Sequence, residues 1–442
     1  MYRFAQQTLI DWCKQKQFKP LLLRGARQVG KSYLVENFAK SHFDSYVTIN
    51  FEFNRKFQTC FNTLDPSKIV NLISTMANQD IIPGKTLLFL DEIQECPNAI
   101  LALRYFKEKM PKLHVIGAGS LLEFTLNKSE FRMPVGRIQS FYLTPCSFYE
   151  FLLAKGKRKL LDYLTNVTLA EGIDAGLHGL LLDELREYFV LGGMPEVIAG
   201  FVNDPDLRRA HTAQASLIEY YRKDFGKYDD KVKLDYLQSL FDKIPNLIGQ
   251  KFKYVNIDPH ALSRDLKPAL QALIDAGLVY PTYHTSASNL PLQSTINERI
   301  FKLFFLDIGL VSYMSQVDIE TLMSENLIML NRGQLAEQFV HQELLAHSRV
   351  YEKTHLYYWQ REKAGSTAEV DFIINIGTKI IPIEVKAGKT GRLKALQIFL
   401  NEKKLNLGIR VWQNQLAYHE RILSIPLYLV AEIPLLIRTL PN

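Results

Sequence analysis

A glycine-bounded run near the start of the chain has the spacing that a phosphate-binding loop requires. Residues 25–32 read GARQVGKS, which places Gly25, Gly30, Lys31 and Ser32 at the fixed positions of G-x-x-x-x-G-K-[ST]. The glycines let the backbone turn so that successive N–H groups point at one anion. Lys31 would reach the β- and γ-phosphates of ATP, and Ser32 would ligate its Mg²⁺.

The residues on either side of this run agree with that interpretation. The apolar run 21–23 predicts a buried strand before the loop, and residues 33–40 have helical spacing after it. The N-terminus of such a helix would face the same anion. The residues expected to surround the phosphates are Gly25, Ala26, Arg27, Gln28, Val29, Gly30, Lys31, Ser32 and Tyr33.

Two acidic residues end a second apolar run. Residues 86–90 (TLLFL) predict a strand that leads directly into Asp91 and Glu92. Beside a phosphate loop, Asp91 is expected to hold the Mg²⁺ shell and Glu92 to polarise the attacking water. The alternative is a strand that ends at a solvated acidic turn.

Two polar residues further along the chain are weaker candidates for the same site. Ser120 follows a predicted strand at 113–116 and could sense the γ-phosphate, although a small polar loop residue needs no such role. Arg137 is a candidate arginine finger that would act in trans on a second copy, which requires a homo-oligomer. The alternative for Arg137 is a solvated surface residue.

A second constellation lies after residue 330. Glu337 stands near the start of a predicted amphipathic helix, and Asp371, Glu384 and Lys386 fall on predicted strands. Residues i and i+2 of a strand share a face, so Glu384 and Lys386 should point the same way, toward Asp371. Two carboxylates there can hold Mg²⁺ or Mn²⁺ that activates water, with Glu337 completing the metal shell. Lys386 would stabilise charge on the reacting phosphate.

The D…E-x-K pattern is weak by itself, because charged side chains often pair across surface strands. An acidic residue on the preceding helix, an otherwise apolar strand and the basic residues Lys389, Arg392 and Lys394 support it. Two interpretations stay open: a metal-dependent nuclease, and a structural relic that binds nucleic acid or a partner.

Four strings give the first part of the chain a family resemblance. They are GARQVGKS at 25–32, NFE at 50–52, LLFLDEIQ at 87–94 and VGRIQSFYLTPCSFYEFL at 135–152. With them the chain resembles the AAA-type P-loop ATPases of bacteria and archaea that carry an uncharacterised C-terminal region. The strings LGGMPEVIAGF (191–201) and YYRKDFGKY (220–228) extend the resemblance. One departure is Ala118-Gly119-Ser120, where the family usually has Thr-Gly-Ser.

The C-terminal constellation carries a second resemblance. Its residues are similar to those of the PD-(D/E)xK nuclease superfamily, including the restriction-enzyme and Holliday-junction-resolvase-like members. The resemblance covers Glu337, Asp371, Glu384 and Lys386, with all four residue types intact. It implies an α/β nuclease-like fold and a divalent metal at this site.

The region between these two parts carries few catalytic signatures. Residues 180–190 have helical apolar spacing, and LGGMPE (191–196) would end that helix. Helical segments at 259–264 and 267–276, followed by β-like runs at 278–283 and 301–306, outline a winged helix. Such a module can read a DNA groove, but the apolar second helix favours a packing or interaction module.

Charge is divided unevenly along the 442 residues. The net charge is +7 overall, made up of +7 over residues 1–155, −5 over 156–330 and +5 over 331–442. Basic ends suggest anionic ligands at both, although surface charge also varies between domains without any such meaning. Four scattered cysteines without a CxxC pair, no long apolar stretch and no apolar signal core predict a cytoplasmic protein that spans no membrane.

Together these observations predict an α/β protein in three parts. They are an AAA-type P-loop NTPase domain (1–155), a helical and winged-helix-like region (156–330) and a PD-(D/E)xK nuclease-like domain (331–442). The predicted function is ATP hydrolysis that regulates a Mg²⁺-dependent nuclease-like domain acting on nucleic acid, DNA more readily than RNA. The alternative is a nucleotide-dependent switch or interaction protein whose nuclease-like domain only binds.

Overall fold

The computed structural model describes residues 1–127, 136–228, 233–316, 333–363, 365–386 and 393–440. The chain divides into two compact units. Unit 1 contains Met1–Pro145, Asp275–Gly277 and Arg349–Lys353. Unit 2 contains Cys146–Ile274, Leu278–Ser348 and Thr354–Asn442. Each unit is built around its own β-sheet.

Unit 1 is a parallel five-stranded sheet in the order β2-β3-β4-β1-β5. Its strands are β1 (Leu21–Arg24), β2 (Ser45–Asn50), β3 (Thr86–Asp91), β4 (His114–Ala118) and β5 (Gln139–Tyr142). Its helices are α1 (Ala5–Cys13), α2 (Lys31–His42), α3 (Pro66–Ala77), α4 (Pro97–Lys109) and α5 (Leu122–Leu126), with the short 3₁₀ segments η1 (Arg55–Asn62) and η2 (Ile93–Glu95). The predicted strands at 21–23, 86–90 and 113–116 and the helix after the loop are confirmed.

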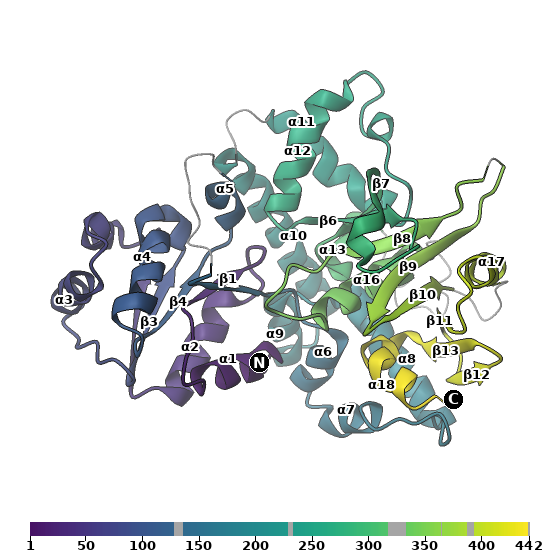
Figure 1. Ribbon diagram of the computed structural model, residues 1–442, viewed down its shortest axis with the longest axis horizontal. Helices are drawn as coiled ribbons and strands as arrows, with labels where there is room; N and C mark the ends of the chain where they lie inside the picture. Colours follow the sequence, from purple (N-terminus) through teal and green to yellow (C-terminus); the bar gives the residue numbers. More distant parts are fainter. Residues whose placement is uncertain (128–135, 229–232, 317–332, 364, 387–392, 441–442) are drawn as a thin grey trace. The chain divides into compact units, whose positions relative to one another are not determined.

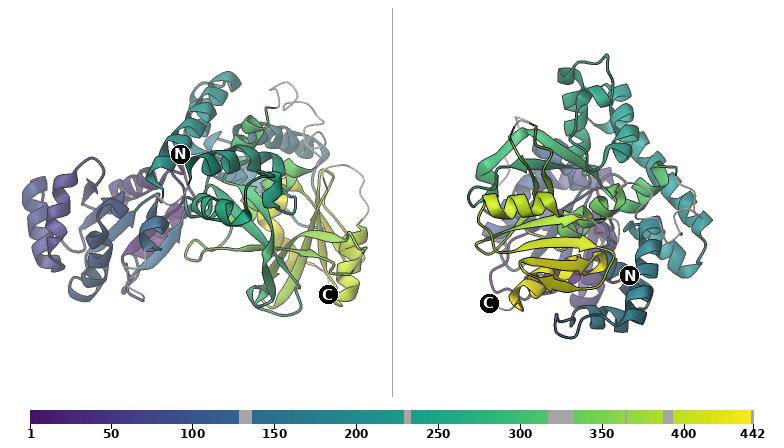
Figure 2. Two further views of the ribbon diagram at one scale, coloured as in Figure 1. Left: turned by 90° about the horizontal axis from the view of Figure 1, so that it is seen from above. Right: turned by 90° about the vertical axis from the view of Figure 1, so that its right-hand side faces the viewer.

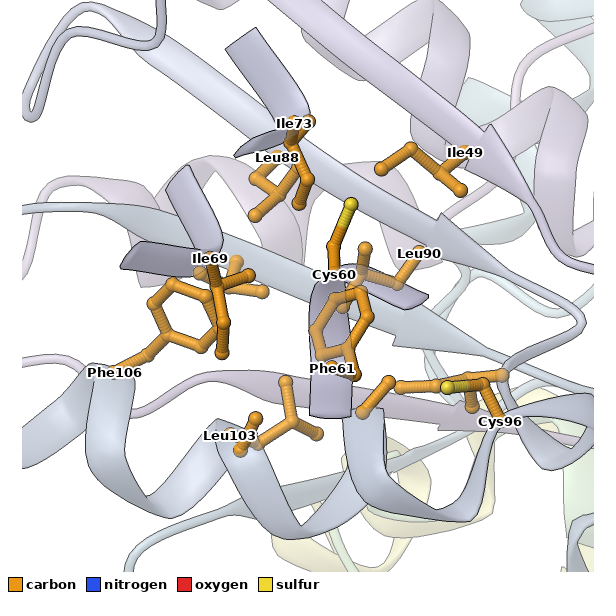
Figure 3. Packing of buried hydrophobic residues seen from close by; sticks show 14 of the residues in the cluster. Ile49, Cys60, Phe61, Ile69, Ile73, Leu88, Leu90, Cys96, Leu103 and Phe106 are labelled. Carbon is orange, nitrogen blue, oxygen red and sulfur yellow. The ribbon is translucent and has the colours of Figure 1, made fainter. Parts of the chain in front are cut away.

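Helices cover both faces of this sheet, as an all-parallel sheet needs. On one face Cys60 and Phe61 of η1 lie between the strand residues Leu88 and Leu90 and the side chains of α3 and α4 (Figure 3). On the other face Trp12 of α1 lies edge-on to the His114 ring, 5.2 Å between centroids. Burial on both sides fixes the strand ends, and therefore the loops that follow them.

Unit 2 contains an eight-stranded mixed sheet in the order β12-β13-β11-β10-β9-β8-β6-β7 (Figure 1). Its strands are β6 (Val279–Thr285), β7 (Ile296–Phe305), β8 (Leu356–Gln360), β9 (Glu369–Ile376), β10 (Lys379–Val385), β11 (Gly408–Trp412), β12 (Ala417–His419) and β13 (Ile422–Pro426). The green and yellow strands of this sheet face the viewer in the right-hand view of Figure 2. The strands predicted to carry Asp371 and Glu384 are confirmed as β9 and β10.

The helices of unit 2 surround this sheet. They are α6 (Phe148–Ala154), α7 (Arg158–Leu164), α8 (Ala175–Leu191), α9 (Pro195–Asn203), α10 (Leu207–Asp224), α11 (Leu234–Lys243), α12 (Ser263–Asp275), α13 (Ile308–Met314), α16 (Gln334–Ala346), α17 (Lys394–Glu402) and α18 (Ile433–Arg438). His341 of α16 stacks on Phe304, whereas Phe399 of α17 packs edge-on to Trp359. The helix predicted at 180–190 is confirmed as α8, and the predicted helix with Glu337 near its start is confirmed as α16.

The winged-helix outline is not what the middle of the chain forms. A single helix, α12, stands where two were predicted, because residues 259–261 form only bends and residue 262 has no regular structure before it. The strands β6 and β7 do pair as an antiparallel hairpin, but β6 also pairs with β8. The hairpin therefore extends the C-terminal sheet, and that sheet takes strands from both sides of the predicted boundary at residue 330.

Among the described helices, none is long and apolar enough to cross a bilayer. The four cysteines all lie in described segments and carry free thiols.

Candidate functional site

The loop between β1 and α2 has the backbone that its glycines allow. Gly25 has φ 144°, and a Cβ there would lie 2.2 Å from the carbonyl oxygen of Leu143. Gly30 has φ 89° and precedes the first residue of α2, Lys31. A side chain at Gly25 would therefore clash and one at Gly30 would be strained. The N-terminus of α2 faces the loop as a phosphate site requires.

Lys31 is a buried cation whose described contacts are backbone carbonyls. Its Nζ donates to the carbonyl oxygens of Gly25 at 3.0 Å and Ala26 at 2.8 Å. Burial lowers the pKa of Lys31 to about 8, although Glu92 and Asp91 oppose that effect. Carbonyl dipoles compensate a buried ammonium poorly, so this side chain suits an anionic ligand.

Ser32, the second polar residue of the motif, meets the first predicted carboxylate. Its Oγ donates to Oδ2 of Asp91 at 2.9 Å, and Nδ2 of Asn50 donates to the same oxygen at 3.1 Å. Burial and the neighbouring Glu92 raise the pKa of Asp91. A hydroxyl and two carboxylates are hard oxygen ligands, so Ser32, Asp91 and Glu92 fit a Mg²⁺ ion.

Glu92 is held by two polar side chains from different elements. Its Oε2 accepts from Nε2 of Gln94 at 2.7 Å and from Oγ of Ser120 at 3.2 Å. The Ser120 hydroxyl in turn accepts from Nε of Arg27 at 3.1 Å. The structure thus joins Ser120 to the loop and to the predicted water-polarising carboxylate, with β4 leading to Ser120 and β3 to Glu92.

Three residues of this site were not predicted from the sequence: Gln94, which donates to Glu92, and Asn50 and Arg3. Asn50 ends β2 and pairs in register with Asp91, a neighbour that becomes visible only once the strand order is known. Arg3 is buried and donates to the carbonyl oxygens of Val29 at 2.9 Å and Thr144 at 2.7 Å. These hydrogen bonds hold Val29 of the loop in place, and Arg3 belongs to no recognisable sequence motif.

Other predicted residues lie at the margin of the site or away from it. Tyr33 is 51% exposed at the start of α2, and Gln28 adopts a left-handed backbone with φ 64°. Arg137 comes just before the first residue of β5, whereas the loop follows the last residue of β1. Because β5 runs parallel to β1, Arg137 lies at the end of the sheet opposite the loop. Its side chain is 53% exposed and pairs with Glu108 at 3.1 Å. Arg137 is therefore not brought to the loop of its own chain.

In unit 2 the four predicted residues come together in one acidic cluster, defined here as Glu337, Glu369, Asp371, Glu384, Lys386 and Lys302. Nζ of Lys386 lies 2.5 Å from Oε1 of Glu384, which confirms that the two share a face. Oδ2 of Asp371 accepts from the backbone N–H of Val385 at 2.8 Å. Of the basic residues predicted nearby, Lys389 and Arg392 fall outside the described residues and Lys394 begins α17.

The sixth member of the cluster, Lys302, was not predicted. This residue of β7 is only 1% exposed, and its Nζ lies 2.5 Å from Oε1 of Glu369, 3.5 Å from Oε2 of Glu337 and 3.7 Å from Oδ1 of Asp371. Burial alone would lower the pKa of Lys302, but Glu337, Asp371 and Glu369 together raise it above its ordinary value. The pairing makes this lysine a firmly charged group.

Two carboxyls of the cluster are strongly perturbed. Burial raises the pKa of Glu337 to about 8; Lys302 opposes the shift, and Asp371 and Glu369 add to it. Burial also raises the pKa of Glu384 to about 8, with Asp371 adding and Lys386 opposing. The second carboxyl oxygen of Glu384 is buried and has no hydrogen-bond partner among the described residues.

The arrangement of the cluster does not fit the divalent metal that the nuclease resemblance implies. The ammonium of Lys302 already lies between Glu337, Glu369 and Asp371. Throughout the described segments, no group of three or more His, Cys, Asp or Glu side chains is arranged to hold a metal ion. The residues are therefore gathered as predicted, but around a lysine.

A parallel sheet with a glycine loop after β1 and an acidic pair after β3 defines a P-loop ATPase domain. The comparison with protein families agrees, since residues 17–152 match the model of the AAA domain named AAA_14. Residues 182–321 and 332–429 match two domains of unknown function, DUF8612 and DUF4143. These two models meet near the predicted boundary at 330, although the sheet of unit 2 crosses it.

The solved structures to which the chain is similar share little sequence with it. The Walker-type ATPase PABY2304 of Pyrococcus abyssi is 15% identical, with a TM-score of 0.44 over 70% of this chain and 94% of that one. The ORC1 protein of Aeropyrum pernix, solved in complex with DNA, is 10% identical, with a TM-score of 0.27 over 71% and 90%. Among the curated proteins, no relative matches the chain.

Proposed function

We propose that the chain hydrolyses ATP with Mg²⁺ at the loop of unit 1 and uses this reaction as a switch. The observation that carries the proposal is the meeting of Ser32 and Asp91 beside a second carboxylate, Glu92, which two polar side chains hold in place. In P-loop ATPases one group helps to hold the metal ion and a different group orients the attacking water.

Each residue has a distinct role in this proposal. Lys31 leaves the carbonyl oxygens of Gly25 and Ala26 to bind the β- and γ-phosphates. Ser32 and Asp91 hold Mg²⁺, which neutralises charge on the phosphates when bound. Glu92 orients the attacking water and accepts its proton.

Ser120 and Gln94 position Glu92 and do not themselves react. Arg27, hydrogen-bonded to Ser120 at 3.1 Å, gives the loop a route by which a bound γ-phosphate would alter the contacts of Glu92. The trans-acting finger role of Arg137 stays a prediction that needs a homo-oligomer.

Substituting Glu92 by Gln tests the proposal. We expect E92Q to bind ATP as the wild type does while its turnover falls by about 100-fold or more, because the amide cannot accept the proton. K31A should lose ATP binding. The measurements are steady-state phosphate release and binding of a fluorescent ATP analogue, with E95Q as the matched control on the exposed side of η2. Turnover by E92Q at the wild-type rate would show that another group orients the water.

For unit 2 we propose the second of the two predicted roles, an interaction domain for a partner or nucleic acid whose access ATP turnover regulates. The position of Lys302 favours this role over phosphodiester hydrolysis. Its ammonium pairs with the carboxylates of Glu337, Glu369 and Asp371, which a catalytic metal ion would need as ligands. The resemblance of the motif residues to nucleases does not by itself decide activity. The choice of DNA over RNA stays a prediction from the sequence.

A further inference from the structure

The surroundings of Lys302 are those of a bound cation. Its ammonium has carboxylates of α16 and β9 around it, and it also lies over the Tyr358 ring, 5.2 Å from the centroid. A tight turn closes the cluster: Gly249 has φ 73°, and a Cβ there would lie 2.6 Å from Oε2 of Glu337. A side chain at this position would be strained by the positive φ and would require the Glu337 carboxylate to shift.

A divalent ion and this ammonium would compete for the same oxygens. Mg²⁺ and Mn²⁺ take oxygen ligands at about 2.0 to 2.2 Å and usually retain several waters. The Nζ of Lys302 is 2.5 Å from Oε1 of Glu369 and 3.7 Å or less from oxygens of Glu337 and Asp371. A second cation placed among those oxygens would meet an adjacent positive charge in a buried setting, where charge repulsion is strong.

We propose that Lys302 is the resident cation of the acidic cluster and that it excludes a divalent metal from it. Its ion pairs hold α16 against β7 and β9, so the cluster joins these elements without a metal. This inference concerns unit 2 alone and does not depend on ATP hydrolysis in unit 1.

The position of Lys302 in the sequence explains why the motif does not include it. Residue 302 lies on β7, before the region that resembles the nuclease superfamily. It reaches the cluster because β6, to which β7 pairs, joins the sheet next to β8. The four motif residues are intact, so the residue that would decide metal binding comes from outside the motif.

Manganese binding to the full chain tests the proposal. Free Mn²⁺ is followed by electron paramagnetic resonance during titration of the wild type, D371N, K302M and K302M/D371N. Any binding at the nucleotide loop is common to all four proteins. We expect the wild type and D371N to bind equal amounts of Mn²⁺. K302M should bind one additional Mn²⁺ at the cluster, with an affinity there at least about tenfold above that of the wild-type cluster. The double variant K302M/D371N should lose this additional site.

Two further variants separate charge from position. K302R keeps the charge and should gain no site, and K386M removes the other ammonium of the cluster and should also gain none. A wild type that binds one more Mn²⁺ than D371N overturns the proposal, and this comparison needs no Lys302 variant to fold. A folded K302M that gains no Asp371-dependent site overturns it too. Equal binding by wild type and D371N supports it even if K302M fails to fold.

Discussion

The two units each bury one lysine close to carboxylates, and the two lysines have opposite environments. Lys31 in unit 1 donates to the carbonyl oxygens of Gly25 and Ala26, and burial lowers its pKa to about 8. Lys302 in unit 2 contacts three carboxylates, and its pKa is raised. The buried charge of Lys31 is only partly compensated by its surroundings, whereas three carboxylates compensate the charge of Lys302.

This difference separates a binding site from a structural one. A buried charge whose hydrogen bonds go to carbonyl dipoles, with carboxylates that only partly offset its burial, gains most from an incoming anion, because the cost of its burial has already been met. A charge surrounded by carboxylates has little to gain from a ligand and much to lose if its partners are removed. Motif residues alone do not distinguish these cases, since both sites keep all of theirs.

Removing each lysine in turn should give the largest contrast. K302M is expected to destabilise unit 2 by about 3 to 5 kcal/mol, because buried carboxylates lose their cation. K31M should leave the stability of unit 1 unchanged or raise it, since a buried ammonium is replaced by an apolar chain of similar length. Hydrogen exchange of the amides in β7, α16 and β3 measures both effects.

The control is K386M, which removes a cluster ammonium that remains partly exposed, with 28% of its side chain accessible. Its effect should be smaller than that of K302M. Equal losses for K31M and K302M would remove the distinction between the two sites.

The pH dependence of stability offers a second, smaller contrast. The pKa of Lys31 is about 8 in the folded protein and 10.5 ordinarily, so between pH 8 and 10.5 the unfolded chain binds more protons. Stability of unit 1 should therefore rise with pH across this window, by at most about 1.4 kcal/mol per pH unit. K31M should lack that contribution.

Urea denaturation at pH 8 and pH 10, without nucleotide, measures this slope through the fluorescence of Trp12. Trp359 and Trp412 are first replaced by Phe, so that the signal reports unit 1 alone. Identical slopes with and without Lys31 would mean that its ammonium is compensated after all, like that of Lys302.

The smallest expected effect is on nucleic acid. Incubated with plasmid or linear DNA and Mg²⁺ or Mn²⁺, the wild type should cleave no more than the D371A/K386A double variant, with or without ATP. Gel electrophoresis of the products measures this. Metal-dependent nicking by the wild type that the double variant lacks would restore the nuclease prediction and break the contrast between the two lysines.

The phosphate loop was predictable because its residues are consecutive. Gly25, Lys31 and Ser32 meet within one strand-loop-helix segment, so spacing alone specifies their geometry. The contact between Ser32 and Asp91 could also be expected, because parallel strands bring their carboxyl ends to one edge. Asn50 and Arg3 depend on strand order and tertiary packing, which no local pattern encodes.

In unit 2 the strands and the shared face of Glu384 and Lys386 followed from alternation. Two β-like runs at 278–283 and 301–306 were predicted here, but not the strand that β6 would join, because local pattern does not say which edge of a sheet a strand will pair with. That one pairing, Thr282 to Leu356 in register, places Lys302 among the carboxylates. The sequence therefore predicted that Glu337, Asp371 and Glu384 lie together, but it did not predict Lys302 among them.

The same pairing limits how far the C-terminal region is modular. A fragment starting at residue 331 would keep every motif residue but would turn β8 into an open sheet edge with unpaired backbone groups. It would also leave Glu337, Glu369 and Asp371 without the ammonium that joins them. A break in the chain at that point would thus separate the carboxylates of the acidic cluster from Lys302. The smallest part of unit 2 that keeps the cluster intact is therefore the sheet that begins at β6.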